Sequence, residues 1–158
     1  LNHRDPGVIA AALSPSLAFA AAIADGVHVH AEMLRMALRL RGAAGMILVT
    51  DKVALAHAPK DVAQRAAAHG VGVRDGVARL DNGTIAGAVI SLLDGLRMMV
   101  ERAGASVGES AMMASTNPAL LLGIADRGRL EVGARADILV LDDKLRLKTA
   151  FIGGRELT

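Results

Sequence analysis

The sequence predicts an α/β fold in which parallel strands alternate with helices and a small β segment follows at the end. Two continuous apolar runs, residues 17–24 and 46–50, are typical of strands covered on both faces of a parallel sheet. Between them, residues 31–41 carry apolar side chains at helical spacing, and Gly42 follows as a glycine commonly does after a helix. Strand, helix and strand in this order indicate a βαβ unit.

The rest of the chain predicts further helices and two short antiparallel parts. We expect a hairpin around Asp75-Gly76 and a second turn at Asn82-Gly83. Ser106 and Glu109 have the spacing of a capping box, and Asn117 with Pro118 is the pattern of an N-cap followed by the first helical residue. The expected helices cover residues 8–13, 61–69, 91–102, 106–114 and a stretch from 117 to 123, and the expected final strands cover 136–141 and 147–152.

Composition limits the classes of function. The 158 residues suit one domain by length, and with only two Phe the core has to come from Leu, Ile, Val and Met. The net charge of +2, without a basic run or interleaved aromatic residues, argues against a nucleic-acid partner. No apolar run approaches the roughly 18 residues of a membrane span, so we expect no membrane segment. The absence of Cys excludes thiolate metal sites and suits the cytoplasm.

Asp51 directly follows the apolar run 46–50. Acids at the carboxyl ends of barrel strands face the pocket in which catalysis takes place. Without that context, a single Asp after a strand is more often a helix cap or a turn former. Asp51 is therefore the candidate catalytic residue, with a structural role as the alternative.

The segment Asp25-Gly26-Val27-His28 follows the other apolar run. Two His at positions i and i+2, such as His28 and His30, can bind a metal from one side of a strand. Here the chain continues directly into the helix, so the two rings do not share a face. We interpret His28 as a substrate contact and His30 as an exposed residue near the helix start.

Two other segments are weaker candidates. Arg4 lies before a Pro-Gly turn, where an Arg is usually a solvated surface residue but can also hold a phosphate or carboxylate. Residues 82–87 are rich in glycine but lack the Gly-Lys-Ser/Thr of a phosphate-binding loop, so they are most simply a turn that leads into a strand.

Taken in order, these segments resemble the N-acetylglucosamine-6-phosphate deacetylases of the amidohydrolase superfamily. The specific matches are Asp25-Gly26-Val27-His28 and Gly83-Thr84-Ile85-Ala86-Gly87, with Arg4 and Asp51 at matching places. The ending, with Asn117-Pro118 and the stretch from Gly128 to Asp137, is shared more widely in the superfamily. The resemblance extends over nearly the whole chain.

The resemblance implies a metal-dependent hydrolase with a (β/α)₈ TIM barrel and a small β-sandwich. Such a barrel needs about 250 residues. We therefore expect residues 1–127 to be the C-terminal half of the barrel domain and residues 128–158 the C-terminal strands of the sandwich. The family's divalent metal ion, zinc or iron, is bound by a Glu and two His that would precede Leu1. No residue here is expected to be a metal ligand, and the chain alone is expected to be neither metal-loaded nor a complete enzyme.

The resemblance also implies roles for individual residues. Asp51 matches the general acid/base, Arg4 a phosphate contact, and Asp25, Gly26, Val27 and His28 a substrate-binding segment. Ile85, Ala86 and Gly87 match a loop that contacts substrate. Two positions depart from the family pattern: Lys52 stands where Ala is usual, and Ala88 where Ser is usual.

The implied reaction hydrolyses the acetamide of N-acetylglucosamine 6-phosphate to glucosamine 6-phosphate and acetate. The expected partners are this small amino-sugar phosphate and further copies of the chain, because an incomplete parallel sheet exposes strand edges. Two alternatives stay open. One is an amidohydrolase that acts on another N-acyl or cyclic amide, and the other is a non-catalytic segment that binds a ligand or a partner subunit.

Overall fold

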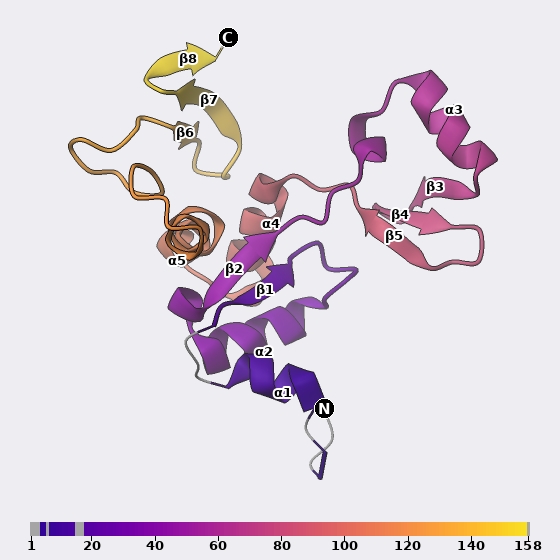
Figure 1. Cartoon of the computed structure of the whole chain (residues 1–158), viewed down its shortest axis with the longest axis horizontal. Coiled ribbons are helices and arrows are strands. Elements are labelled where there is room, and N and C mark those ends of the chain that lie inside the picture. The colour runs from indigo at the N-terminus through magenta and orange to yellow at the C-terminus, as the bar shows by residue number, and fades with distance from the viewer. Residues whose placement is uncertain (1–3, 6, 15–17, 158) are drawn as a thin grey trace.

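The computed structural model describes residues 4–5, 7–14 and 18–157. In this part of the chain the strands form three small sheets, with strand orders β1-β2, β3-β4-β5 and β6-β7-β8. Figure 1 shows β1 and β2 between helices, with the β3–β5 sheet and α3 to one side and the β6–β8 sheet to the other. The expected α/β architecture is therefore present.

The βαβ unit is confirmed. β1 (Ala20–Ile23) and β2 (Met46–Val49) pair in parallel, with Ala20 opposite Met46 and Ile23 opposite Val49, and α2 (Ala31–Arg41) connects them. β2 is buried over its first three residues, whereas β1 is only partly buried, which differs from our expectation. The reason is that the helical residues 92–98 and 112–121 pack against β2 and cover it. Leu17, which we placed in this strand, lies outside the described residues.

Local signals set the ends of α2. The Nδ1 atom of His30 accepts a hydrogen bond of 3.2 Å from the Glu32 N–H, so His30 caps the helix start and stays exposed, as expected. Gly42, at φ 69°, ends the helix and donates its N–H to the Leu38 carbonyl at 2.8 Å. The short η1 (Ala43–Gly45) then leads into β2, and α1 (Gly7–Leu13) packs against α2 (Figure 1).

The expected hairpin is β3 (Val71–Arg74) and β4 (Val77–Leu80), joined at Asp75-Gly76. After the Asn82-Gly83 turn, β5 (Ile85–Ala88) adds antiparallel to β4. The Asn82 side-chain oxygen accepts the Thr84 N–H at 3.0 Å, which is the local bond that favours Asn in such turns. η2 (Ala54–His57) and α3 (Lys60–Ala68) precede β3.

A helical layer follows. α4 (Leu92–Met98) and α5 (Val107–Ala111) both begin with a capping box, formed by Ser91 with Asp94 and by Ser106 with Glu109. The Ser106 box was expected. Each helix continues as a π-helical turn, η3 (Met99–Ala103) and η4 (Met112–Thr116), and η4 runs on into α6 (Asn117–Leu121).

The expectation that Asn117 caps a new helix is wrong. Asn117 has helical angles (φ −66°, ψ −42°) and continues the helical segment from η4. Its side chain is buried at 4% exposure, and its Nδ2 donates to the carbonyls of Ala43 (2.8 Å) and Met46 (2.7 Å). Asn117 therefore ties the helical layer to the start of β2 instead of starting a helix.

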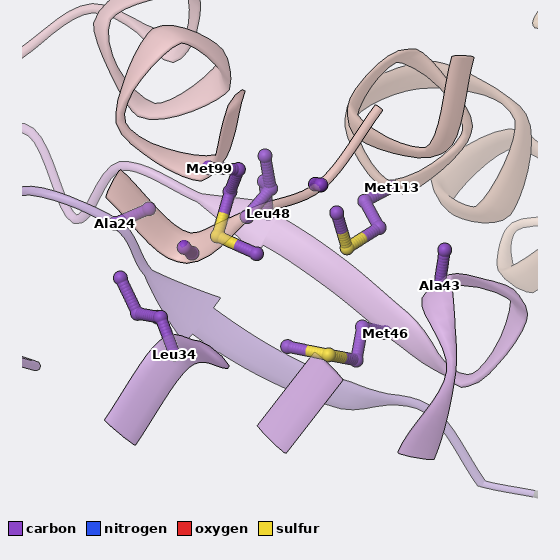
Figure 2. Close-up of a cluster of buried hydrophobic side chains, with 9 residues drawn as sticks. Ala24, Leu34, Ala43, Met46, Leu48, Met99 and Met113 are labelled. Atoms are coloured by element: carbon purple, nitrogen blue, oxygen red, sulfur yellow. The ribbon is translucent and has the colours of Figure 1, made fainter. Parts of the chain in front are cut away.

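The main hydrophobic core lies between β2, α2 and the helical layer (Figure 2). Its large members are Leu34, Leu48 and three methionines, with alanines filling the gaps; the buried set is Ala24, Leu34, Ala43, Met46, Leu48, Met99, Ala103, Ala105 and Met113. The sequence predicted a core of Leu, Ile, Val and Met, and Ile47 and Val77 are also buried elsewhere in the described residues. In this cluster, flexible thioethers fill the irregular space beside small residues, which suits a chain with few aromatic residues.

The end of the chain forms β6 (Ile138–Leu141), β7 (Leu147–Ile152) and β8 (Arg155–Leu157), all antiparallel. The first two strands were expected and β8 was missed, although Gly153-Gly154 is a recognisable two-residue hairpin turn. Among the helices that the structure describes, none is long and apolar enough to cross a membrane.

Asn117→Ala is expected to destabilise the fold. The change leaves the buried carbonyls of Ala43 and Met46 without this donor, which typically costs about 1–3 kcal/mol. Gln64→Ala, on the exposed side of α3, is the control and should stay within about 0.5 kcal/mol. Urea unfolding measures both. Equal free energies of unfolding for the two variants would contradict the role of Asn117.

Candidate active site

The parallel pairing of β1 and β2 brings two aspartates to the same edge of the sheet. Asp25 lies two residues after β1, and Asp51 lies two residues after β2. Since the strands are in register, the two carboxyl ends lie side by side. The site is built outward from these two positions.

Asp25 organises the turn after β1. Its Oδ1 accepts the backbone N–H groups of Val27 (2.9 Å) and His28 (2.8 Å), and its Oδ2 lies 2.6 Å from His28 Nδ1. Burial raises the pKa of Asp25, but the hydrogen bonds from the His28 ring and from the two backbone N–H groups outweigh it and hold the pKa below its ordinary value. The carboxylate is thus ionised at neutral pH.

His28 lies between the two aspartates. Its side chain is 16% exposed, and its Nε2 is 4.0 Å from Asp51 Oδ2. This separation is too long for a hydrogen bond and is that of a loose ion pair when the ring is protonated. The structure therefore brings together Asp25, His28 and Asp51, three residues that the sequence singled out.

Asp51 has an unusual backbone and an accessible side chain. Its φ is 51°, in the left-handed region that Asp adopts more readily than most residues, and its side chain is 61% exposed. The Asp51 carbonyl accepts the Ala88 N–H at 2.8 Å, and the Val53 N–H donates to the Ala88 carbonyl at 3.0 Å. These bonds to β5 hold the chain on both sides of Lys52 and so fix where the carboxylate emerges.

Gly87 allows β5 to approach the Asp51 segment this closely. It is buried at φ 134°, and a Cβ on it would lie 2.5 Å from Val53 Cγ1 and 3.0 Å from the Asp51 carbonyl oxygen. Ile85 and Ala86 precede it on the same strand, partly buried and exposed respectively. The three residues predicted as a substrate-contacting loop are thus a strand beside Asp51, with Ala86 accessible.

Gly26 and Val27 lie in the Asp25 turn. Gly26, at φ 77°, faces α4 so closely that a Cβ would lie 2.9 Å from Met98 Cε, and Val27 is 38% exposed. Arg4 is an exposed residue ahead of α1. The geometry described above does not involve Arg4, so its predicted phosphate contact stays a prediction.

Lys52 does not form an ion pair with Asp51 among the described residues. It forms an isolated parallel bridge with Ala88, and its charge contributes to lowering the pKa of Asp94. That pKa is raised by burial and lowered more strongly by the Ser91 hydroxyl and backbone N–H, by Arg97 and by Lys52. Both departures from the family pattern, Lys52 and Ala88, therefore meet at one backbone bridge next to Asp51.

The described residues do not make a metal site by themselves. No group of three or more His, Asp or Glu side chains in this part of the chain could hold a metal ion. At the strand edge, one nitrogen of His28 is hydrogen-bonded to Asp25. Among the described residues there, this leaves His28 Nε2 and the Asp51 carboxylate as possible metal ligands. Catalytic zinc sites have three protein ligands.

Comparison with known proteins now decides the family. The sequence pattern of the amidohydrolase family matches residues 10–157. This chain belongs to the amidohydrolase family. The resemblance seen in the sequence is thereby confirmed.

Three relatives describe how this amidohydrolase chain compares. It is 32% identical over 157 residues to the N-acetylglucosamine-6-phosphate deacetylase of Lysinibacillus sphaericus, covering 98% of this chain and 40% of the relative. The crystal structure of the Thermotoga maritima N-acetylglucosamine-6-phosphate deacetylase matches with a TM-score of 0.86 at 32% identity, covering 99% of this chain and 43% of that chain. A putative N-acetylgalactosamine-6-phosphate deacetylase of Escherichia coli K12 is 33% identical, with 98% of this chain and 92% of the relative covered. The chain thus spans about two fifths of the first two relatives and most of the third.

Sequence reasoning missed two contributors to the candidate site. One is Val53, which packs against Gly87 and carries one of the two backbone bonds to Ala88; no sequence signal marks it. The other is the turn-forming role of Asp25. The order Asp-Gly-x-His contained a signal for it, since Asp commonly accepts the backbone N–H two residues further along.

Gly87→Ala is expected to destabilise the site more than Gly83→Ala. Both residues have positive φ, so both variants carry backbone strain. Only at Gly87 does the added Cβ meet Val53 and the Asp51 carbonyl, whereas nothing lies within 4 Å at Gly83. The free energy of unfolding, measured with urea, should fall at least about 1 kcal/mol further for Gly87→Ala. Equal losses would show that β5 does not constrain Asp51.

Proposed function

We propose that this chain is the catalytic-aspartate-bearing part of a deacetylase that acts on an N-acetylhexosamine 6-phosphate. The substrate is N-acetylglucosamine 6-phosphate, and the products are glucosamine 6-phosphate and acetate. The observation that carries the proposal is the exposed Asp51 carboxylate, held on a fixed backbone 4.0 Å from His28 Nε2. The amidohydrolase pattern and the names of the relatives agree with this reaction.

In the proposed reaction, Asp51 is the general base and then the general acid. Water adds to the acetamide carbonyl carbon while its proton passes to the Asp51 carboxylate. The tetrahedral adduct then breaks its C–N bond, and the same carboxyl returns the proton to the departing amine. An exposed carboxylate suits this exchange, because water and substrate can reach it.

Four of the other predicted residues bind the substrate in this proposal. His28 contacts the amino sugar through Nε2, Val27 and Ala86 offer exposed surface beside it, and Arg4 binds the 6-phosphate. Gly26, Ile85 and Gly87 shape the two segments that carry these contacts. A divalent metal, zinc or iron, is proposed to be bound by residues that this chain does not contain.

The same proposal assigns residues 1–127 to a (β/α)₈ barrel and residues 128–158 to a β-sandwich. β1, β2 and the helices around them are the α/β part, and β6 to β8 are the separate sheet, in agreement with that boundary. Homo-oligomers, a cytoplasmic location and the inactivity of these residues alone stay predictions.

A second substrate is favoured by one comparison. The Escherichia coli relative that this chain covers almost completely is named for N-acetylgalactosamine 6-phosphate. The two sugars are epimers with the same acetamide and the same phosphate, so Asp51 and Arg4 would serve both. Measuring kcat/KM for both epimers with one enzyme preparation distinguishes the two candidates.

Asp51→Asn is expected to remove turnover without loss of the fold. The amide keeps the shape and also tolerates positive φ, but it cannot take a proton, so kcat should fall at least about 10²–10⁴-fold. The assay measures acetate release from N-acetylglucosamine 6-phosphate by the complete gene product that contains these residues. Asp75→Asn is the matched control, because Asp75 is an exposed aspartate at φ 53° in a distant turn. Near-parental kcat for Asp51→Asn would refute the proposed mechanism.

Arg4→Ala is expected to weaken recognition of the phosphate. A charge-assisted hydrogen bond to an anion contributes about 1.5–3 kcal/mol, so KM should rise about tenfold or more for the 6-phosphate. KM for unphosphorylated N-acetylglucosamine should barely change. Arg39→Ala, on the exposed last turn of α2, serves as the control. Equal effects on both substrates would remove Arg4 from the phosphate site.

A further inference from the structure

The Asp25 carboxylate has no free face for a substrate. Its side chain is only 1% exposed, and its two oxygens are engaged by three donors of its own turn: two backbone N–H groups and the His28 ring. In this arrangement the Asp25 carboxylate offers almost no exposed surface to a sugar. Its contacts point to a role within its own turn, and its predicted substrate contact stays a prediction.

We propose instead that Asp25 is a positioning residue, which fixes the tautomer and the orientation of His28 so that Nε2 faces the site beside Asp51. The substrate-facing role of Nε2 rests on the proposed deacetylase function. The tautomer itself does not depend on that function.

The proton on His28 follows from the state of Asp25. Its hydrogen bonds hold the pKa of Asp25 below its ordinary value, so the group is a carboxylate that can only accept. His28 Nδ1, 2.6 Å away, must then be the donor. A neutral ring in this tautomer presents the lone pair of Nε2 to a substrate hydroxyl or N–H. A second proton would make Nε2 a donor to a carbonyl, with Nδ1 still bound to Asp25.

The turn that carries this pair is firmly seated. The Gly26 backbone lies against Met98 of α4, and Gly95 of the same helix packs where a Cβ would be 3.7 Å from the Ala24 carbonyl oxygen. Ala24 itself is 1% exposed in the core. Because strand, turn and helix are packed together, the position of Asp25 is set by the core, and that of His28 is set by Asp25.

The two other histidines with described ring bonds supply internal references. His30 Nδ1 accepts the Glu32 N–H, so His30 should carry its proton on Nε2. His69 Nδ1 lies 2.8 Å from the Arg65 carbonyl, which can only accept, so His69 should carry its proton on Nδ1. In long-range ¹H–¹⁵N spectra of this chain, the neutral His28 should match His69 and differ from His30. His28→Gln identifies the His28 signals by their loss.

Asp25→Asn should reverse the tautomer. The amide oxygen can still accept the backbone N–H groups of Val27 and His28, but the NH₂ group now faces Nδ1 and makes it an acceptor. The His28 proton should then move to Nε2, just as replacing the aspartate of a Ser-His-Asp triad by asparagine leaves the histidine in the wrong tautomer. Asp61→Asn, which removes an exposed partner of Arg65, is the control and should leave His28 unchanged.

Two outcomes would overturn the assignment: an Nε2–H tautomer in the parent chain, or an unchanged tautomer in Asp25→Asn. If Asp25→Asn does not fold, the parent spectrum alone still decides. In the complete enzyme, Asp25→Asn should lower kcat/KM at least about tenfold, with Asp61→Asn unchanged. A reversed tautomer with unchanged kcat/KM would refute the catalytic importance of the positioning. Failure of the Asp51→Asn test would leave the tautomer result intact, so the two proposals can fail separately.

Discussion

The parallel register between β1 and β2 is the constraint on which the site depends. It aligns Ile23 with Val49, so the chain leaves both strands at the same edge, and Asp25 and Asp51 follow at equal distances from the strand ends. A shift by one residue would turn the side chains of one strand to the opposite face and separate the two aspartates. Met46, Ile47 and Leu48 of β2 are all buried, so such a shift would be costly because it would disrupt the packing on both faces of the strand. Core packing thus determines the site geometry.

Contacts with segments distant in the sequence hold the backbone around Asp25 and Asp51 in place. Asp51 has a positive φ, which costs free energy. Two backbone hydrogen bonds stabilise this conformation: the Ala88 N–H donates to the Asp51 carbonyl, and the Val53 N–H donates to the Ala88 carbonyl. The partner strand, β5, reaches Asp51 only because Gly87 has no side chain. On the other side, Gly26 lets the Asp25 turn rest on α4. Gly26 and Gly87, which the sequence placed in predicted substrate-binding segments, thus permit close packing at the site.

Local signals made much of the fold predictable, and tertiary contacts made the rest unpredictable. Gly42, Asp75-Gly76 and the Ser106 capping box act within a few residues, so the sequence predicted the elements they bound. Asn117 with Pro118 has the local pattern of a helix start. Its actual hydrogen-bond partners, Ala43 and Met46, lie more than 70 positions earlier in the chain, where no local pattern indicates them. The difference in burial between β1 and β2 likewise depends on distant helices, which pack against β2. At the site, strand-end position predicted Asp51, whereas the family resemblance drew attention to residues 85–87.

The two aspartates show how environment assigns different chemistry to one residue type. Both follow a parallel strand, and both lie near the ring of His28. Asp25 is buried and saturated with donors, so it stays ionised and can only hold the ring in place. Asp51 is mostly exposed, and the described hydrogen bond at this residue is accepted by its backbone carbonyl and not by its carboxylate. The proposed general acid/base needs an accessible carboxylate, whereas the proposed positioning residue needs fixed partners. Exchanging the two environments would therefore suit neither proposed role, even though every residue type stayed the same.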